Sequence, residues 1–264
     1  MSCIAFSGHQ SAVRETEYAF ENLPEGLNEK NIVFVADVHH SRSFPERALD
    51  ALCETIRALA PDILVIGGDN AESEREQEAF FARMANIPAE ICKVCVPGNN
   101  DWECFHGSYK RLKRLCAASD VRLLANEWME IPVAGGRLIN CGCDDAKYGQ
   151  PKPSSLPLHR KQGDFVLLAS HSPHALPRIL SEDRATPDLV LCGHTHGGQI
   201  RIGRISPYLL LRKKIRNNPY FIASGERDFG GMRLLVSCGV GMSRLPLRVG
   251  AMPEIHKIVL RTRE

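Results

Sequence analysis

The stretch that decides the fold is Ile-Val-Phe-Val-Ala-Asp-Val-His, residues 32–39, in which a short apolar run leads directly into two possible metal ligands. Four similar apolar runs follow it, at 63–66, 91–96, 165–169 and 189–192. They are short and several are rich in β-branched residues, so we predict strands buried on both faces. Between the early runs, apolar residues recur at helical spacing over 49–59 and 80–84. Strands that alternate with helices predict crossover connections and a mainly parallel sheet.

The last third of the sequence has a different pattern. Short strand-like segments at 199–202, 233–237 and 255–260 are separated by glycine and proline. We predict that they form mostly antiparallel strands of a second sheet, packed against the first. No linker rich in serine, glycine or proline interrupts the sequence and no repeat is visible, so we expect a single domain over residues 1–264.

The composition narrows the class of protein. Apolar residues make up 44% and charged residues 24%, values typical of soluble globular proteins and not of disordered or fibrous ones. The formal net charge of +2 gives no strong attraction for nucleic acid over the whole surface. Several of the ten cysteines fall inside apolar runs, namely Cys92, Cys95, Cys192 and Cys238, and we predict buried free thiols in a reducing compartment.

The sequence also bears on membrane contact. Residues 1–20 contain no apolar stretch of signal-peptide length, and no apolar run approaches the roughly 20 residues that span a bilayer. We therefore expect a cytoplasmic protein, or one peripheral to the inner membrane. The segment Tyr208 to Arg216 mixes apolar residues with four cations, and as a helix it could lie on an anionic membrane or line an acyl-chain groove. We favour the other interpretation, a connecting element with a solvated basic face.

Each of the five apolar runs is followed by residues that can bind a metal. These candidates are Asp37, His39, Asp69, Asn99, His171, His194 and His196. Because the carboxyl ends of parallel strands meet at one edge of a sheet, we expect the seven side chains to form one cluster there. Imidazole, carboxylate and amide oxygen together suit Mn, Fe or Zn. Since seven ligands are more than one cation needs, we predict two divalent metal ions that share a carboxylate, the usual arrangement for phosphoryl-ester hydrolysis.

Each motif taken alone has a simpler interpretation. An Asp-x-His such as Asp37–His39 is more often a helix cap or a surface pair, and Gly68–Asp69 alone indicates a turn. A lone His-x-His such as His194–His196 binds metal only in a minority of cases. Their order, and their shared position after five separate strands, favour the metal site. Residues at i and i+2 lie on one side of an extended segment, so each pair can converge on one cation or on two adjacent ones.

With these motifs the sequence resembles the calcineurin-like metallophosphoesterases, whose pattern runs Asp-x-His, Gly-Asp, Gly-Asn-His-Asp/Glu, a lone His and Gly-His-x-His. The resemblance covers roughly residues 32–260. The segment Gly-His-Thr-His-Gly-Gly-Gln-Ile at 193–200 and a tail with Val-Ser-Cys-Gly-Val-Gly-Met-Ser at 236–243, Arg248 and Pro253 is similar to the YkuE/YaeI-like bacterial branch. This implies an α/β fold, a four-layer αββα sandwich of two mixed β-sheets flanked by helices.

The resemblance also implies roles for the ligands. One cation would lie on Asp37, His39 and His196, the other on Asn99, His171 and His194, with Asp69 bridging both. The implied reaction is attack of a metal-bridging hydroxide on phosphorus in a phosphodiester or a nucleotide-linked pyrophosphate. The substrate would be a small molecule or lipid-linked, as in a UDP-diacylglucosamine-like precursor. A non-catalytic metal-binding scaffold of the same fold and a DNA-processing nuclease remain as alternatives.

The third motif departs from the family pattern. It reads Gly-Asn-Asn-Asp at 98–101, so Asn100 stands where the family usually has a histidine that can protonate the leaving oxygen. An amide donates a hydrogen bond but cannot supply a proton. We therefore expect leaving groups that need little protonation, such as a phosphate or an aryl oxygen. The catalytic candidates are Asn100, Asp101 and His40, and the candidate substrate contacts are Asn100, His106 and Gln199. The proton donors within reach are His40 and His106, each of which could instead be an ordinary loop histidine.

Overall fold

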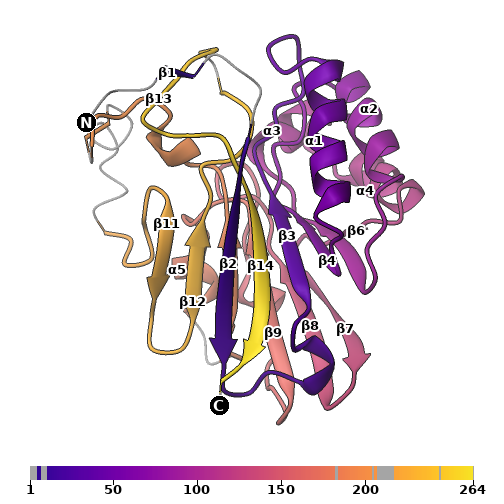
Figure 1. The fold of residues 1–264 in the computed structure, drawn as a ribbon, viewed down its shortest axis with the longest axis vertical. Helices are drawn as coiled ribbons and strands as arrows, with labels where there is room; N and C mark the ends of the chain where they lie inside the picture. Colours follow the sequence, from indigo (N-terminus) through magenta and orange to yellow (C-terminus); the bar gives the residue numbers. More distant parts are fainter. Residues whose placement is uncertain are drawn as a thin grey trace.

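Two six-stranded mixed sheets form the centre of the molecule (Figure 1). The computed structural model describes residues 5–6, 11–181, 184–203, 205–206, 217–243 and 245–263. The first sheet contains, in order across it, β2 (Ala12–Phe20), β14 (Glu254–Thr262), β3 (Asn31–Val35), β4 (Ile63–Ile66), β5 (Cys92–Cys95) and β6 (Arg122–Leu123). The second contains β11 (Gly225–Asp228), β12 (Arg233–Val236), β10 (Leu189–Cys192), β9 (Asp164–Ser170), β8 (Gly136–Gly142) and β7 (Glu127–Val133). A small antiparallel pair joins β1 (Ala5–Phe6) to β13 (Arg248–Val249).

Helices cover the outer face of the first sheet (Figure 1). They are α1 (Glu46–Ala58), α2 (Glu74–Met84) and α4 (Lys110–Ala118). Leu49, Leu52 and Ile56 recur at helical spacing and form the buried stripe of α1. Ser73 caps α2 by accepting a hydrogen bond from the backbone N–H of Glu76. The helical patterns at 49–59 and 80–84 therefore correspond to α1 and α2, and α4 was not predicted.

The layer between the two sheets is apolar. In β3, Ile32 and Phe34 face the second sheet, while Val33 and Val35 face the helices. The other face of the second sheet packs against the short helix α5 (Leu176–Ile179) and the loops around it. Further short helical turns are η1 (Glu25–Leu27), α3 (Asn99–Cys104), η2 (Pro153–Ser155) and η3 (His196–Gly198). The predicted α/β fold of two mixed sheets flanked by helices is confirmed.

Two predictions about the sheets were wrong. The five strands that carry the candidate ligands do not share a sheet: β3, β4 and β5 belong to the first, and β9 and β10 to the second. In the last third, β14 lies inside the first sheet, parallel to β2 and antiparallel to β3, and β12 is parallel to β10. Residues 199–202 form only isolated bridges. The physical reason is that strand pairing depends on packing against distant partners, which the local sequence pattern does not encode. Here β14 pairs with both β2 and β3.

Membrane contact and the cysteines were also predicted from sequence. No helix among the described residues is long and apolar enough to cross a bilayer. The segment Tyr208 to Arg216, for which we favour a connecting element over membrane contact, lies outside the described residues. The nine cysteines that the structure describes are free thiols, and seven of them are buried.

The layer between the sheets makes a stability prediction possible. Phe165 of β9 is fully buried there, and its ring contacts Phe20 edge to face with centroids 4.9 Å apart. We expect Phe165→Ala to lower the free energy of unfolding by about 3–5 kcal/mol, because the lost apolar contact leaves a cavity. Urea unfolding followed by circular dichroism measures this. Trp128→Ala is the control, since Trp128 is 40% exposed; equal losses for the two variants would show that the layer is not the core.

Candidate metal centre

The seven candidate ligands lie where strands from both sheets end. From the first sheet, Asp37 and His39 follow β3 and Asp69 follows β4, while Asn99 opens α3 after β5. From the second sheet, His171 follows β9, and His194 and His196 follow β10. Backbone hydrogen bonds tie these loops together: the N–H of Asp37 donates to the Gly68 carbonyl at 2.9 Å, and that of His39 to the Asp69 carbonyl at 3.0 Å. The candidate centre therefore lies beyond the carboxyl ends of these strands, where loops from both sheets meet.

The first group of possible ligands is Asp37, His39 and His196, whose ligand atoms lie within 4.8 Å of one another. His39 Nε2 is 3.1 Å from His196 Nε2, and His196 Nε2 is 3.4 Å from Asp37 Oδ1. All three side chains are buried. Two imidazole nitrogens and one carboxylate oxygen thus face a common point, as the ligands of one cation do.

The second group is Asp69, His171 and His194. His194 Nδ1 lies 3.1 Å from His171 Nε2, which is 3.4 Å from Asp69 Oδ2. The same Asp69 oxygen is 3.7 Å from His39 Nε2 of the first group. Asp69 Oδ1 instead accepts a hydrogen bond from the backbone N–H of Asn100 at 2.7 Å. Asp69 is therefore the carboxylate that reaches both groups.

Asn99 provides a test of whether these residues fit a metal. Its side chain is buried, and its Oδ1 has no hydrogen-bond partner among the described residues. Its Nδ2 donates to Asn100 Oδ1 at 2.8 Å, so the amide oxygen is the atom of this side chain that remains able to bind a cation. A buried carbonyl oxygen without a partner costs about 1–3 kcal/mol, which a cation would offset. The donor set of imidazole, carboxylate and amide oxygen fits Mn, Fe or Zn.

The loops that carry the ligands have unusual backbone conformations. Positive φ angles occur at Asp37 (53°), His39 (48°), Asp69 (52°), His194 (70°) and His196 (50°). A non-glycine residue in this left-handed region costs of order 1–2 kcal/mol. Such strain concentrates at functional sites, where the surrounding structure maintains it. At Gly98, a Cβ would lie 2.2 Å from Asp69 Oδ1, so this position requires glycine to leave room for the carboxylate.

The buried charges perturb one another. Burial raises the pKa of Asp37 to about 6. Burial would also raise the pKa of Asp69, but His171, His39 and His194 outweigh it and lower that pKa. Burial disfavours protonated His171, yet Asp69 raises its pKa to about 10. Burial, with the neighbouring His39 and Arg248, lowers the pKa of His196 well below its usual value. Clusters of oppositely shifted groups are typical of functional sites.

Two residues that contact the ligands were not assigned roles from the sequence. Arg248 is fully buried; its Nη2 lies 3.1 Å from His196 Nδ1, and its Nε donates to the Gly241 carbonyl at 2.8 Å. Glu72 Oε1 lies 2.5 Å from His39 Nδ1. The carboxylate of Glu72 can accept the ring N–H of His39, and a contact of this kind orients a metal-binding histidine. The guanidinium of Arg248 can only donate, so His196 Nδ1 is the acceptor in its contact. Arg248 belongs to the tail motif, so the sequence contained a signal for it, whereas Glu72 is a single acidic residue in a loop and gave none.

Two of the three predicted catalytic residues lie behind the ligand groups. Asp101 is fully buried, and its carboxylate accepts backbone N–H bonds from Gly98 at 2.8 Å and Asp69 at 2.9 Å. His40 is buried with Nδ1 2.8 Å from the Phe44 carbonyl. Neither residue lines the cleft over the ligands. Their contacts hold the ligand loops in place.

A cleft of about 1030 Å³ lies over the ligand groups, and Asp69, Asn99, Asn100, His194 and His196 are part of its lining. Arg42, Lys147 and Tyr148 also line it, and Ile200, Met242, Leu245 and Pro246 contribute an apolar part. Gln199 lines the cleft as predicted for a substrate contact, but its amide is occupied: Nε2 donates to the Leu245 carbonyl at 2.8 Å, and Oε1 accepts from the Ser243 N–H at 3.0 Å. It therefore anchors the loop that carries the apolar part.

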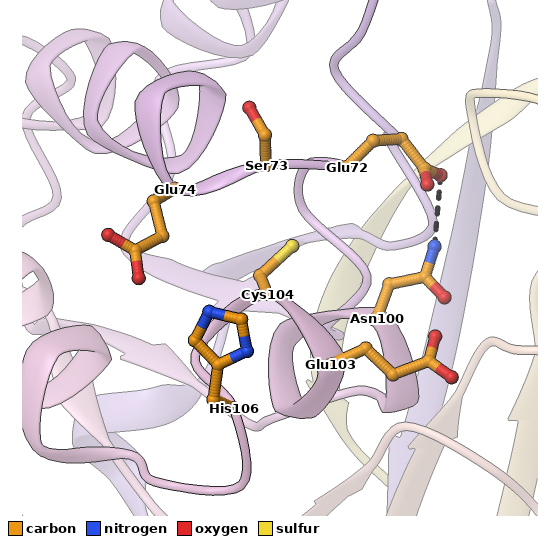
Figure 2. A pocket seen from close by; sticks show the side chains of 7 residues that line it. All are labelled: Glu72, Ser73, Glu74, Asn100, Glu103, Cys104 and His106. Atoms are coloured by element: carbon orange, nitrogen blue, oxygen red, sulfur yellow. Dashed lines mark hydrogen bonds between the residues drawn. The ribbon is translucent and has the colours of Figure 1, made fainter.

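A smaller cavity of about 370 Å³ contains His106 together with Asn100, Glu72 and Glu103, and the last three also line the large cleft (Figure 2). His106 is exposed to solvent. His106 therefore lines the same cavity as Asn100, whereas His40 lines neither this cavity nor the large cleft.

Comparison with known proteins identifies close resemblances. The model of the family described as "Calcineurin-like phosphoesterase" matches residues 30–198. The uncharacterized protein YpbG of Bacillus subtilis is 32% identical over 87% of this chain and 80% of its own length. The uncharacterized metallophosphoesterase YkuE of the same organism is 29% identical, over 95% of this chain and 86% of YkuE. Phosphodiesterase YaeI of Escherichia coli is 27% identical, over 87% of this chain and 81% of YaeI. Among solved structures, a dimetal phosphatase from Danio rerio is 12% identical with a TM-score of 0.49, over 89% of this chain and 100% of that one.

The shared position of Asp69 predicts the effect of removing its charge. We expect the wild-type chain to bind about two equivalents of Mn²⁺ and Asp69→Asn to bind less than one, because both groups lose the negative charge of the same carboxylate. Elemental analysis after dialysis measures this. In melting experiments, chelator should destabilise the wild type by about 2.7 kcal/mol for each cation lost, relative to protein with Mn²⁺ at a hundred times its dissociation constant. Glu54→Gln, on the exposed side of α1, is the control; unchanged binding in Asp69→Asn would contradict the shared site.

Proposed function

The chain belongs to the calcineurin-like phosphoesterase family, and on that premise we propose that it hydrolyses phosphodiesters or nucleotide-linked pyrophosphates at a site for two divalent cations. The observation that carries the proposal is the pair of ligand groups joined by Asp69 Oδ2, which lies 3.4 Å from His171 Nε2 and 3.7 Å from His39 Nε2. When bound, two such cations neutralise charge on phosphoryl oxygens and lower the pKa of coordinated water to roughly 7.

The proposed ligand roles follow the two groups. Asp37, His39 and His196 would hold one cation. Asn99, His171 and His194 would hold the other, and Asp69 would contact both. The unpartnered oxygen of Asn99 and the converging imidazole nitrogens support this assignment. Mn, Fe and Zn all match the donors.

The preference for diesters and anhydrides rests on Asn100. Its amide donates to Glu72 Oε1 at 2.9 Å and accepts from Asn99 Nδ2 at 2.8 Å, so it is held in place and has no proton to give. Leaving groups of low basicity depend least on a general acid. His106, exposed in the adjoining cavity, is the proton donor that we propose for the remaining cases.

The residues that line the cleft support a substrate with a charged part and an apolar part. Arg42 and Lys147 are the cations of the lining for a diphosphate or a second phosphoryl group, and Lys147 Nζ lies 3.9 Å from Glu103 Oε1 in the same lining. On the apolar part, Leu245 is 56% exposed and Ile200 and Met242 lie in the same lining. An apolar surface open to solvent at a cleft favours a hydrophobic ligand. We therefore include lipid-linked phosphoesters in the proposed substrate class.

We also propose a cytoplasmic location. The support is chemical: the nine described cysteines are free, and free thiols persist in reducing compartments.

A substrate panel tests the proposed function. With Mn²⁺ bound, we expect bis-p-nitrophenyl phosphate and a nucleotide-diphosphate sugar to be hydrolysed at least about tenfold faster than alkyl phosphomonoesters, because general-acid assistance is typically worth 10²–10⁴-fold where the leaving group is basic. Asp69→Asn should abolish turnover of every substrate. The rates come from p-nitrophenol released by the diester and from inorganic phosphate released by the monoesters. For the nucleotide-diphosphate sugar, chromatography measures the nucleoside monophosphate and sugar phosphate that are formed.

Three results would contradict the proposal. A preference for monoesters would remove the argument from Asn100. Two bound cations without turnover of any ester would favour the non-catalytic scaffold. Cleavage of single- or double-stranded DNA in preference to small diesters would favour the nuclease.

A further inference from the structure

One exposed carboxylate, that of Glu72, connects to both ligand groups. Glu72 lies three residues after Asp69, in the loop between β4 and α2. Its backbone N–H donates to the His40 carbonyl at 3.1 Å, and the next residue, Ser73, caps α2. The backbone of Glu72 is thus fixed from both sides, while its side chain is 43% exposed. A side chain anchored in this way can orient what it contacts.

The first contact of Glu72 is with His39. A carboxylate only accepts hydrogen bonds, so the Nδ1 of His39, 2.5 Å from Glu72 Oε1, must carry the hydrogen. The other ring nitrogen, Nε2, then keeps its lone pair. This is the nitrogen that faces His196 and Asp69. Glu72 therefore selects the form of His39 that can bind a cation.

The second contact of Glu72 is with Asn100 (Figure 2). Asn100 Nδ2 donates to the same Oε1 at 2.9 Å, because only the nitrogen end of the amide can donate to a carboxylate. The oxygen end of Asn100 then accepts from Asn99 Nδ2 at 2.8 Å. This leaves Asn99 Oδ1 as the buried oxygen without a partner among the described residues. Each amide in the series has only one orientation once the carboxylate is in place.

We propose that Glu72 is a positioning residue that orients ligands of both candidate cations, His39 directly and Asn99 through Asn100. The inference rests on the two-cation site of the proposed function and not on any substrate. It also assigns a role to Asn100. An amide carries a donor and an acceptor on one carbon, which lets it connect the accepting carboxylate of Glu72 to the donating nitrogen of Asn99.

Substitutions of Glu72 in the full chain test the first part. We expect Glu72→Ala to weaken Mn²⁺ binding about 10–100-fold, the usual effect of losing an outer contact to a ligand. Glu72→Gln should retain part of the affinity, because its amide oxygen still accepts an N–H bond. Glu74→Gln is the matched control, since Glu74 lines the same small cavity but pairs with Arg111. Titration calorimetry gives the affinities and circular dichroism verifies the fold. Equal losses in Glu72→Ala and Glu72→Gln would mean that only the charge matters, and would overturn the inference.

A substitution of Asn100 tests the second part. Asn100→Ala leaves the contact between Glu72 and His39 and removes the link to Asn99, together with the 3.0 Å contact of Asn100 Nδ2 with His39 Nδ1. We expect the variant to bind one Mn²⁺ tightly and the second about 10–100-fold more weakly, so the exchange-coupled pair signal in electron paramagnetic resonance should be lost at limiting Mn²⁺. In the double variant with Glu72→Ala, Asn100→Ala should add little further loss for the second cation. Fully additive losses would show that the two residues act separately.

These measurements are independent of turnover. If the wild-type chain binds two cations but hydrolyses no ester, the proposed function fails while the binding data still decide the role of Glu72. If the wild type hydrolyses diesters and Glu72→Ala binds Mn²⁺ as tightly as the wild type, the inference fails and the function stands. Absence of Mn²⁺ binding by the wild type would overturn both.

Discussion

The apolar contact between the two sheets is the constraint on which the rest of the structure depends. Phe34 of β3 and Phe165 of β9 are both fully buried in this layer. Because side chains alternate along a strand, a shift of one residue would turn each buried set toward the wrong face. The register of the layer therefore fixes where the strands end. It brings the loops after β3 and β4 opposite the loops after β9 and β10, and the candidate ligands meet where these loops come together.

The loops at these strand ends are held by more contacts than their length would suggest. The N–H groups of Val240 and Gly241 donate to the carbonyls of Ala36 and Asp37 at 3.0 and 2.7 Å. Asp101 holds the loop of Asp69 from the other side. These bonds offset the left-handed conformations at the ligands, which an isolated loop would relax. The geometry of the candidate centre thus depends on hydrogen bonds to segments that lie far from the ligands in sequence.

The elements that could be predicted from sequence were those with a local signal. Short runs such as Ile63–Ile66 are buried on both faces, and the helical pattern around Leu49 to Ile56 marks one buried stripe. The candidate metal ligands could also be predicted, because they directly follow each apolar run in the sequence. Strand β2 was missed because charged residues such as Glu15 and Glu17 interrupt its apolar character. The sheet to which β14 belongs, and the link from Glu72 to Asn99, depend on partners far away in sequence, and no local pattern encodes them.

The central position of β14 has a consequence for biosynthesis. Residues 254–262 insert between β2 and β3, and Gly239 and Gly241 lie against Asp37. While the ribosome is still adding these residues, the nascent chain already contains every candidate ligand but lacks strand β14. Cation capture in a growing cell should therefore follow the synthesis of β14, and the emerging polypeptide should depend on protection of its unpaired β3 edge until synthesis has passed Thr262.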